Sequence, residues 1–168
     1  FLFLEKYIEN DISKKIKPPK SYKLLPKLIS EKEISNILEY LKKNIKSPRQ
    51  FQTLVITELL YATGMRISEL VSLKISSVAE DFSNIIVKGK GMKERQVPVG
   101  EEASMLLKKY IYKNHNEKSL KKKNLVGWLF PSRKSHITRQ AYFLNLKKAA
   151  IQVKLEPARI SPHTLRHA

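Results

Sequence analysis

Two short β-branched runs set between longer helical segments restrict the fold of this chain more than any other feature. Ile85-Ile86-Val87 and Gln96-Val97-Pro98-Val99 each have the length of a strand, and two glycines lie between them. Glycines between such runs predict a hairpin, and Pro98 restricts the second strand to a sheet edge or marks its end. We therefore predict a mainly α-helical domain with one small antiparallel sheet, an α+β fold.

Apolar residues at helical spacing predict the helices around this hairpin. The first begins at Ser30-Glu31-Lys32-Glu33, a capping box in which the first and fourth side chains each bond the other residue's backbone N–H. Gly64 is expected to end the second helix, because glycine readily adopts the left-handed conformation found past helix ends. The expected segments are helices over 48–64, around 67–73, from Glu101 to Ile111 and over 138–154, and a buried anchor at 128–131.

Residues 1–27 differ in character from the rest of the chain. Leu4, Ile8 and Ile12 have the spacing of a helix end, and residues 14–27 are basic and carry three prolines. Proline prevents helix continuation and favours extended backbone, which is typical of an interdomain linker. We therefore expect residues 1–27 to be the end of one domain plus a linker, residues 28–168 to form the main domain, and the chain to be cut from a larger protein.

The charge of the chain indicates a polyanionic partner. Thirty-three Lys and Arg face fifteen Asp and Glu, a formal net charge of +18 spread along the whole sequence. That distribution favours nucleic acid. A membrane surface is disfavoured because no basic amphipathic anchor or long apolar run is present. The chain has no cysteine, which excludes disulfides and thiolate nucleophiles and agrees with a cytoplasmic location.

The segment Ser161-Pro162-His163-Thr164-Leu165-Arg166-His167 predicts a phosphate-binding helix start. Ser161 suits the N-cap and Pro162 the first helical position, so that His163 and Arg166 share a face near a helix end that favours anions. A zinc site at His163 and His167 is disfavoured, because no Glu follows the first His. An ordinary basic helix start is the other alternative.

Three motifs, taken in order, extend this interpretation: Tyr61-Ala62-Thr63-Gly64-Met65-Arg66-Ile67-Ser68-Glu69-Leu70, Lys88-Gly89-Lys90-Gly91 and His163-Thr164-Leu165-Arg166-His167. Together they resemble the tyrosine recombinases, most closely the Xer branch. The resemblance implies that residues 28–168 have the catalytic-domain fold of this family, truncated at the C-terminus. It also implies that residues 1–27 end a core-binding domain.

The resemblance also implies roles for four residues. Arg66 and Arg166 would be the two catalytic arginines, His163 would bond a nonbridging oxygen or relay a proton, and Lys90 would be the general acid for the leaving 5′-oxygen. Independently of the family, two guanidiniums can hold the negative charge that develops on a phosphodiester, so no metal or other cofactor is implied. The family's tyrosine nucleophile follows the second arginine, so we expect the parent protein to be an enzyme and these 168 residues to be inactive.

Further basic and polar residues are candidates for DNA contact. They are Thr138, Arg139 and Gln140 at a helix start and Lys88, Lys93 and Arg95 on the hairpin. Simpler roles remain open: Thr138 as a plain cap, Arg66 as a partner of Glu69, and the hairpin lysines as solvated side chains, one of which could replace Lys90.

The implied function is site-specific DNA recombination through a 3′-phosphotyrosyl intermediate, in chromosome-dimer resolution. A phage or mobile-element integrase and a noncatalytic DNA-binding remnant are the alternatives. The implied partners are double-stranded DNA, homologous protomers in a tetrameric synapse and a DNA translocase, with no membrane.

Overall fold

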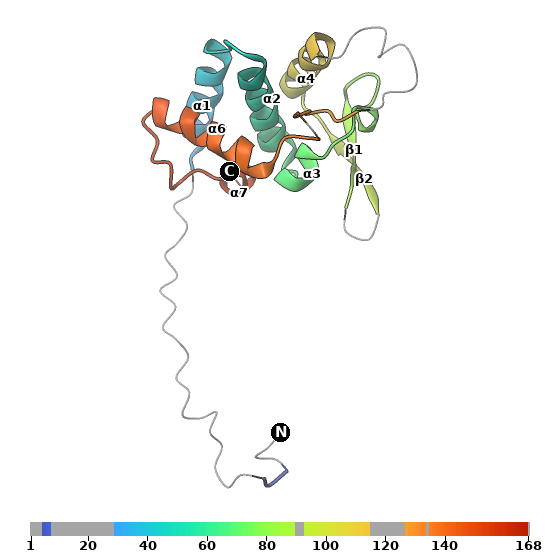
Figure 1. Ribbon diagram of the computed structural model, residues 1–168, viewed down its shortest axis with the longest axis vertical. Coiled ribbons are helices and arrows are strands. Elements are labelled where there is room, and N and C mark those ends of the chain that lie inside the picture. The colour runs from blue at the N-terminus through green and yellow to red at the C-terminus, as the bar shows by residue number, and fades with distance from the viewer. Residues whose placement is uncertain (1–4, 8–28, 90–92, 115–126, 134, 168) are drawn as a thin grey trace.

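The computed structural model describes residues 5–7, 29–89, 93–114, 127–133 and 135–167. Of the expected N-terminal helix end only residues 5–7 are described, and they form a turn rather than a helix. The rest of that segment, the linker, residue Lys90 and the segment 115–126 lie outside the described residues. Within the described part, six α-helices and a two-stranded sheet follow the order predicted from the sequence (Figure 1).

Helix α1 (Glu31–Lys43) begins at the predicted capping box, and helix α2 (Pro48–Thr63) begins at the expected position. The capping box is formed: the Glu33 N–H donates to the Ser30 hydroxyl, and the Ser30 N–H donates to the Glu33 carboxylate at 2.8 Å. Gly64 ends α2 in the left-handed conformation with φ of 59°, and its N–H donates to the Leu60 carbonyl.

Helix α2 is the centre of the packing. Every residue from Phe51 to Leu60 is buried, and the helix is in contact with α1, α3, α4, α6 and α7. Figure 1 shows α6 passing across α2, with α1 on one side and α4 on the other. Because α2 is buried on all sides, the surrounding helices hold it in place and fix the positions of both of its ends.

The remaining helices surround this centre. They are α3 (Ile67–Val71), the 3₁₀ turn η2 (Ile75–Ser77), α4 (Glu101–Asn114), α6 (Arg139–Gln152) and α7 (Pro162–His167). No helix in the described ranges is long and apolar enough to cross a membrane.

The predicted hairpin is formed by β1 (Asn84–Lys88) and β2 (Glu94–Pro98), which pair antiparallel from Asn84 opposite Pro98 to Lys88 opposite Glu94. Pro98 is the last residue of its strand, as expected. The hairpin lies at the end of the molecule away from α1 (Figure 1).

The expected anchor at 128–131 is only partly buried. Leu129 and Phe130 are fully buried, whereas Trp128 is half-buried and Pro131 is exposed. The Leu129 N–H donates to the Leu73 carbonyl at 2.8 Å, so backbone pairing holds this segment beside the chain that follows α3. Because Lys74 lies over the Trp128 ring, with Nζ 3.6 Å from its centroid, the ring is covered by a side chain rather than by the core.

Candidate active site

Arg66 occupies the junction between α2 and α3, where it is the N-cap of α3 in an extended conformation. Gly64 turns the chain out of α2, and the buried Met65 holds the turn against the core. The side chain of Arg66 itself is 60% exposed. A rigid junction therefore presents an accessible guanidinium, as a phosphate site requires.

Glu69 is the residue that orients Arg66. Its carboxylate, only 10% exposed, accepts from the Arg66 N–H at 3.0 Å and from Arg66 Nη1 at 3.3 Å. The ion pair between Arg66 and Glu69, which the sequence allowed as an alternative role for Arg66, is therefore formed. Since this contact uses one nitrogen of the guanidinium, it leaves donors of Arg66 available to a ligand.

The same carboxylate also accepts hydrogen bonds from a second arginine, which lies on the hairpin. Arg95 on β2 donates from Nη1 to Oε1 at 3.2 Å and from Nη2 to Oε2 at 2.8 Å. Burial alone would raise the pKa of Glu69, but the hydrogen bonds from Arg95 and from the Arg66 backbone outweigh it and lower the pKa below 4.5. Glu69 is therefore a carboxylate shared by two cations.

Helix α7 starts as the sequence predicted, with Ser161 as its cap. The Thr164 N–H donates to the Ser161 hydroxyl at 3.1 Å, and the Ser161 N–H donates to the Thr164 hydroxyl at 2.8 Å. Leu165 is fully buried and fixes the helix, while His163 is exposed on its first turn. His163 makes no hydrogen bond to the described part of the chain.

Arg166 lies beside the junction that carries Arg66. Its Cγ atom is 4.0 Å from the position that a Cβ atom on Gly64 would occupy. The side chain is half-buried, and it forms no ion pair or hydrogen bond with other described residues. Arg166 thus lies beside the C-terminal end of α2 at Gly64, two residues before Arg66, and neither guanidinium is fully occupied by a carboxylate of the described residues.

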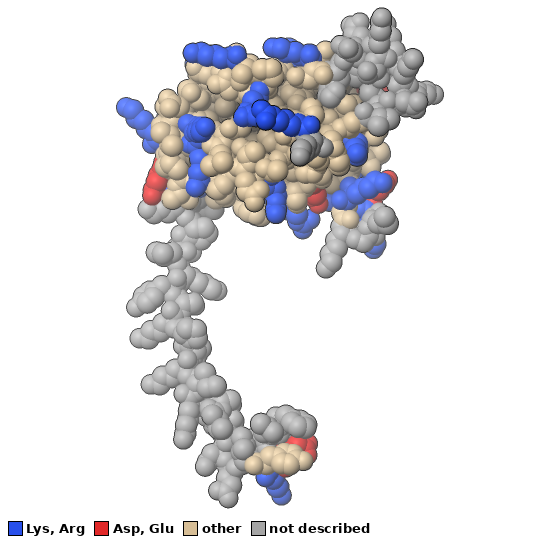
Figure 2. All heavy atoms as spheres, in the orientation of Figure 1, with Lys and Arg blue, Asp and Glu red and all other residues tan. Residues whose placement is uncertain are grey.

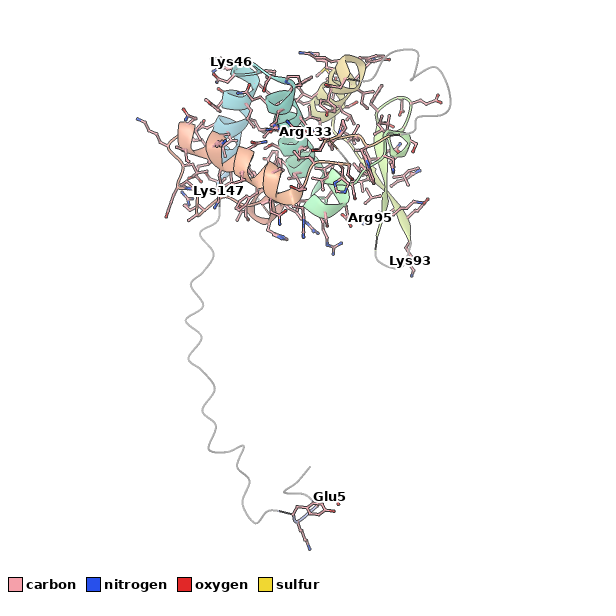
Figure 3. All side chains as sticks on the ribbon, in the orientation of Figure 1. Glu5, Lys46, Lys93, Arg95, Arg133 and Lys147 are labelled. Carbon is pink, nitrogen blue, oxygen red and sulfur yellow. The ribbon has the colours of Figure 1, made fainter. Side chains whose placement is uncertain are left out.

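The hairpin residues predicted to contact DNA have different surroundings. Lys88 pairs with Glu94 across the hairpin at 3.2 Å, and both side chains are exposed. Lys93, the residue before β2, points away from the domain (Figure 3). Arg95 is held by Glu69, as described above. Lys90 lies outside the described residues, so its role remains a prediction.

At the start of α6 the Thr138 hydroxyl accepts from the Ala141 N–H at 3.1 Å, so Thr138 is a helix cap. Arg139 and Gln140 are exposed. Their side chains are accessible to a ligand, and DNA contact by this segment remains a prediction.

Two other features of the described residues bear on the site. No group of three His, Asp or Glu side chains there could hold a metal ion.

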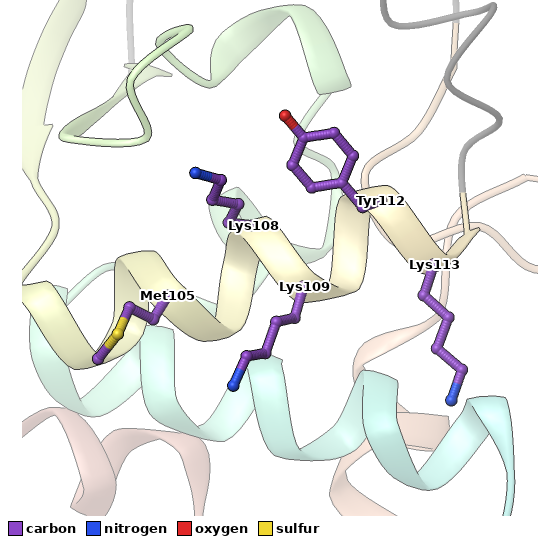
Figure 4. A pocket seen from close by; sticks show the side chains of 5 residues that line it. All are labelled: Met105, Lys108, Lys109, Tyr112 and Lys113. Carbon is purple, nitrogen blue, oxygen red and sulfur yellow. The ribbon is translucent and has the colours of Figure 1, made fainter.

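A hollow on the outer face of α4 is lined by Met105, Lys108, Lys109, Tyr112 and Lys113 (Figure 4), and none of the candidate residues contributes to it.

The model of the phage integrase family matches residues 27–168. The chain belongs to this family.

Its curated relatives are tyrosine recombinases. The chain is 38% identical over 169 residues to the tyrosine recombinase XerD of Yersinia pestis, covering 100% of this chain and 55% of that protein. It is 36% identical over 170 residues to the tyrosine recombinase XerC of Erythrobacter litoralis strain HTCC2594, covering 100% of this chain and 53% of that protein. The chain thus spans about half the length of the curated relatives it matches.

Solved structures agree with the family. XerH bound to its difH substrate in a pre-cleavage complex matches with a TM-score of 0.68 and 26% identity, covering 85% of this chain and 41% of that one. The XerA recombinase matches with a TM-score of 0.66 and 22% identity, covering 98% and 54%, and supports the fold alone. The predicted fold class, mainly helical with a small antiparallel sheet, is confirmed.

Two tyrosines of this integrase-family chain are unsuited to attack a phosphate. Burial raises the pKa of Tyr110 to about 12, against the hydrogen bond that Gln52 donates to its hydroxyl at 3.3 Å. Burial also raises the pKa of Tyr142, whose hydroxyl lies 3.1 Å from that of Thr57 inside the core. Both hydroxyls are inaccessible and difficult to ionise, so they serve packing.

The face of the domain that carries α6 displays many more basic than acidic side chains (Figure 2). Arg133 lies on this face, exposed in the turn before α6 (Figure 3). Nothing in the sequence pattern singled out Arg133. No sequence pattern predicts that Arg66 and Arg95 share the Glu69 carboxylate, because Arg95 is 26 residues away from Glu69 along the chain.

Proposed function

We propose that this chain is the catalytic-domain part of a tyrosine-type site-specific DNA recombinase, with residues 28–168 forming that domain and residues 1–27 leading into it. The observation that carries the proposal is the approach of Arg166 to Gly64, two residues before Arg66. A pair of arginines on a rigid junction suits one phosphate group, and the net charge of +18 suits a polyanion.

In the proposed reaction, the two guanidiniums hold the nonbridging oxygens of the scissile phosphate. They act where negative charge develops as the nucleophile attacks, so they stabilise the transition state more than the ground state. His163, exposed on the same face as Arg166, bonds one of these oxygens or relays a proton. Lys90 protonates the departing 5′-oxygen of the cleaved strand.

The nucleophile in this proposal is a tyrosine C-terminal to Arg166, in a longer protein of which these residues are a part. Attack on the phosphorus forms a bond from the tyrosine oxygen to the 3′-phosphate and breaks the bond to the 5′-oxygen. The phosphotyrosyl bond conserves the energy of the phosphodiester, so a second 5′-hydroxyl can reverse the step and exchange strands.

We propose further that DNA is gripped by Arg139 and Gln140 with Thr138 beside them, and by Lys88 and Lys93 on the hairpin. Homologous protomers would assemble on duplex DNA as a tetrameric synapse in the cytoplasm, and a DNA translocase would activate them. The similarity to XerD and XerC supports the resolution of chromosome dimers as the process that this recombinase serves.

The test is covalent capture. The longer protein is mixed with sheared, nicked genomic DNA from its own cell, denatured in detergent, and recovered with any DNA that remains bound. We expect detergent-resistant DNA from the wild type and none from Arg66→Ala or Arg166→Ala, although both variants still bind duplex DNA. Arg49→Gln, with the same loss of charge at the far end of α2, is the matched control and should give the wild-type yield.

The sequences recovered separate the alternatives. A single repeated chromosomal site supports chromosome-dimer resolution, whereas the ends of a mobile element support an integrase. Absence of any covalent DNA would contradict the proposal and leave a noncatalytic DNA-binding protein.

A further inference from the structure

We propose that Arg95 is a positioning residue: it fixes the Glu69 carboxylate so that Glu69 orients the guanidinium of Arg66 without sequestering it. This inference rests on the proposed function. It gives Arg95 a role within the site in place of the DNA contact expected from the sequence.

The geometry favours an internal role for Arg95. Its guanidinium and the Glu69 carboxylate form two nearly parallel contacts, Nη1 to Oε1 at 3.2 Å and Nη2 to Oε2 at 2.8 Å. A fork-to-fork pair of this kind fixes both partners in orientation as well as in distance. The Glu69 side chain is 10% exposed and that of Arg95 is 44% exposed, so the pair is partly shielded from solvent.

The backbone around Arg95 also fits the pair. Arg95 lies opposite Val87 in the hairpin register, and a Cβ atom on Gly89 would lie 3.5 Å from Arg95 Nη1. At 3.5 Å such a Cβ atom would be in ordinary van der Waals contact with the guanidinium, so the Arg95 side chain lies close to the hairpin backbone at position 89. The hairpin and the α2–α3 junction are therefore joined through one carboxylate.

Sharing this carboxylate matters for Arg66. Glu69 already accepts from the Arg66 N–H at 3.0 Å, and its side-chain contact to Arg66 is a single one at 3.3 Å. Arg95 occupies both carboxylate oxygens more closely than the Arg66 side chain does. Without Arg95, Arg66 is the one cation among the described residues that pairs with the largely buried carboxylate, and a two-point pair would withdraw the guanidinium from the phosphate.

The experiment measures two quantities on the captured DNA site with the longer protein: the rate constant of covalent cleavage at saturating DNA and the dissociation constant of the complex. For Arg95→Gln we expect cleavage to slow by about 10- to 100-fold, the loss typical of a misplaced catalytic group. Binding should change by less than about threefold, because the charge of Arg95 is already balanced by Glu69. Arg95→Lys, which keeps the charge but not the fork, should fall between wild type and Arg95→Gln.

A double-mutant cycle separates positioning from independent effects. Arg95→Gln combined with Glu69→Gln should cleave no more slowly than the slower single variant, because the two residues act through one contact. Arg49→Gln should match the wild type in both quantities. Thermal unfolding of each variant above the assay temperature confirms that the folded fraction is unchanged.

The inference is overturned if Arg95→Gln cleaves at the wild-type rate, if its defect lies in DNA affinity, or if the two defects multiply. Failure of the proposed function has a different signature, because Arg66→Ala would then cleave as well as the wild type or no covalent DNA would form at all. An inactive Arg66→Ala together with a fully active Arg95→Gln would reject only the positioning role.

Discussion

Arg166 Cγ lies 4.0 Å from the place where a Cβ atom of residue 64 would stand, so Arg166 on α7 lies beside Gly64 at the end of α2. The spacing is an ordinary van der Waals distance. A methyl group at position 64 therefore fits beside the arginine, and the constraint on this position comes from its backbone.

Gly64→Ala should destabilise the domain through that backbone conformation. With φ of 59° at this position, an alanine pays the left-handed penalty of about 1–2 kcal/mol in the free energy of unfolding. Urea unfolding measures the loss. Gly100→Ala is the control, because Gly100 has no positive φ and nothing lies within 4 Å of its Cβ position. Gly100 precedes α4 and its carbonyl accepts from the Ser104 N–H, so alanine at this helix cap should cost on the order of 0.5 kcal/mol, less than Gly64→Ala.

Glu33→Gln should lower stability in a pH-dependent way. Hydrogen bonds from the Ser30 N–H and from Arg159, at 2.8 Å and 2.6 Å, hold the pKa of Glu33 below 4.5. A folded-state pKa below the unfolded value contributes stability above the unfolded pKa and loses it as pH falls through the folded pKa. The difference between wild type and variant should therefore be constant above about pH 5.5 and shrink as pH falls below 4.5.

The control for this prediction is Glu39→Gln, on the same helix. Among the described residues Glu39 pairs only with exposed Lys43, at 3.3 Å, so its loss should have almost no effect at any pH. Equal pH profiles for the two variants would show that the Glu33 contacts add nothing specific.

Glu58→Gln should stabilise the protein at neutral pH. The Glu58 side chain is 7% exposed, Lys42 Nζ is 3.7 Å from Oε2, and that oxygen accepts no hydrogen bond from the described residues. Burial raises the pKa of Glu58, and the attraction of Lys42 only partly opposes it. The cost of the charged form is absent below the unfolded pKa and grows as pH rises through the folded pKa.

Chemical unfolding of Glu58→Gln between pH 4 and pH 7 would test this. We expect an advantage over the wild type on the order of 1 kcal/mol at pH 7 that disappears toward pH 4. Glu102→Gln removes an exposed partner of Lys42 and should change stability little. A Glu58→Gln variant less stable than wild type at pH 7 would mean that Lys42 compensates the buried charge.

DNA binding by residues 1–168 should depend steeply on salt. The logarithm of the association constant for duplex DNA should fall linearly with the logarithm of salt concentration, and Lys93→Ala or Arg139→Ala should each reduce the slope by about 0.9. Arg95→Gln should leave the slope nearly unchanged, because its guanidinium faces Glu69. Affinity that does not respond to salt would contradict a phosphate-based contact.

Local signals predicted the elements of this fold well. The caps at Ser30 and Ser161, the end of α2 at Gly64 and the hairpin depend on neighbours a few residues away, and such interactions can be recognised in a sequence. The start of α6 also follows from its cap at Thr138, whereas the helix ends at Gln152, two residues before the expected end.

Contacts between distant residues could not be predicted. Arg95 looked like a cation free to meet DNA, and its pairing with Glu69 exists only once the hairpin packs near α3. Trp128 looked like a core residue, but Lys74 covers it instead. The sequence suggested which residue types a phosphate site needs, and packing decides which of them remain available to a ligand.

The ion pair between Glu33 and Arg159 joins residues that are made at different times during synthesis of the chain. The two residues are 126 positions apart, so at about 5–20 residues per second a ribosome needs roughly 6–25 s to deliver the second after the first. Helix α7, with His163 and Arg166, is made later still. During synthesis, Arg66 therefore emerges well before Arg166, and the arginine pair proposed to hold the phosphate cannot form until α7 has been made.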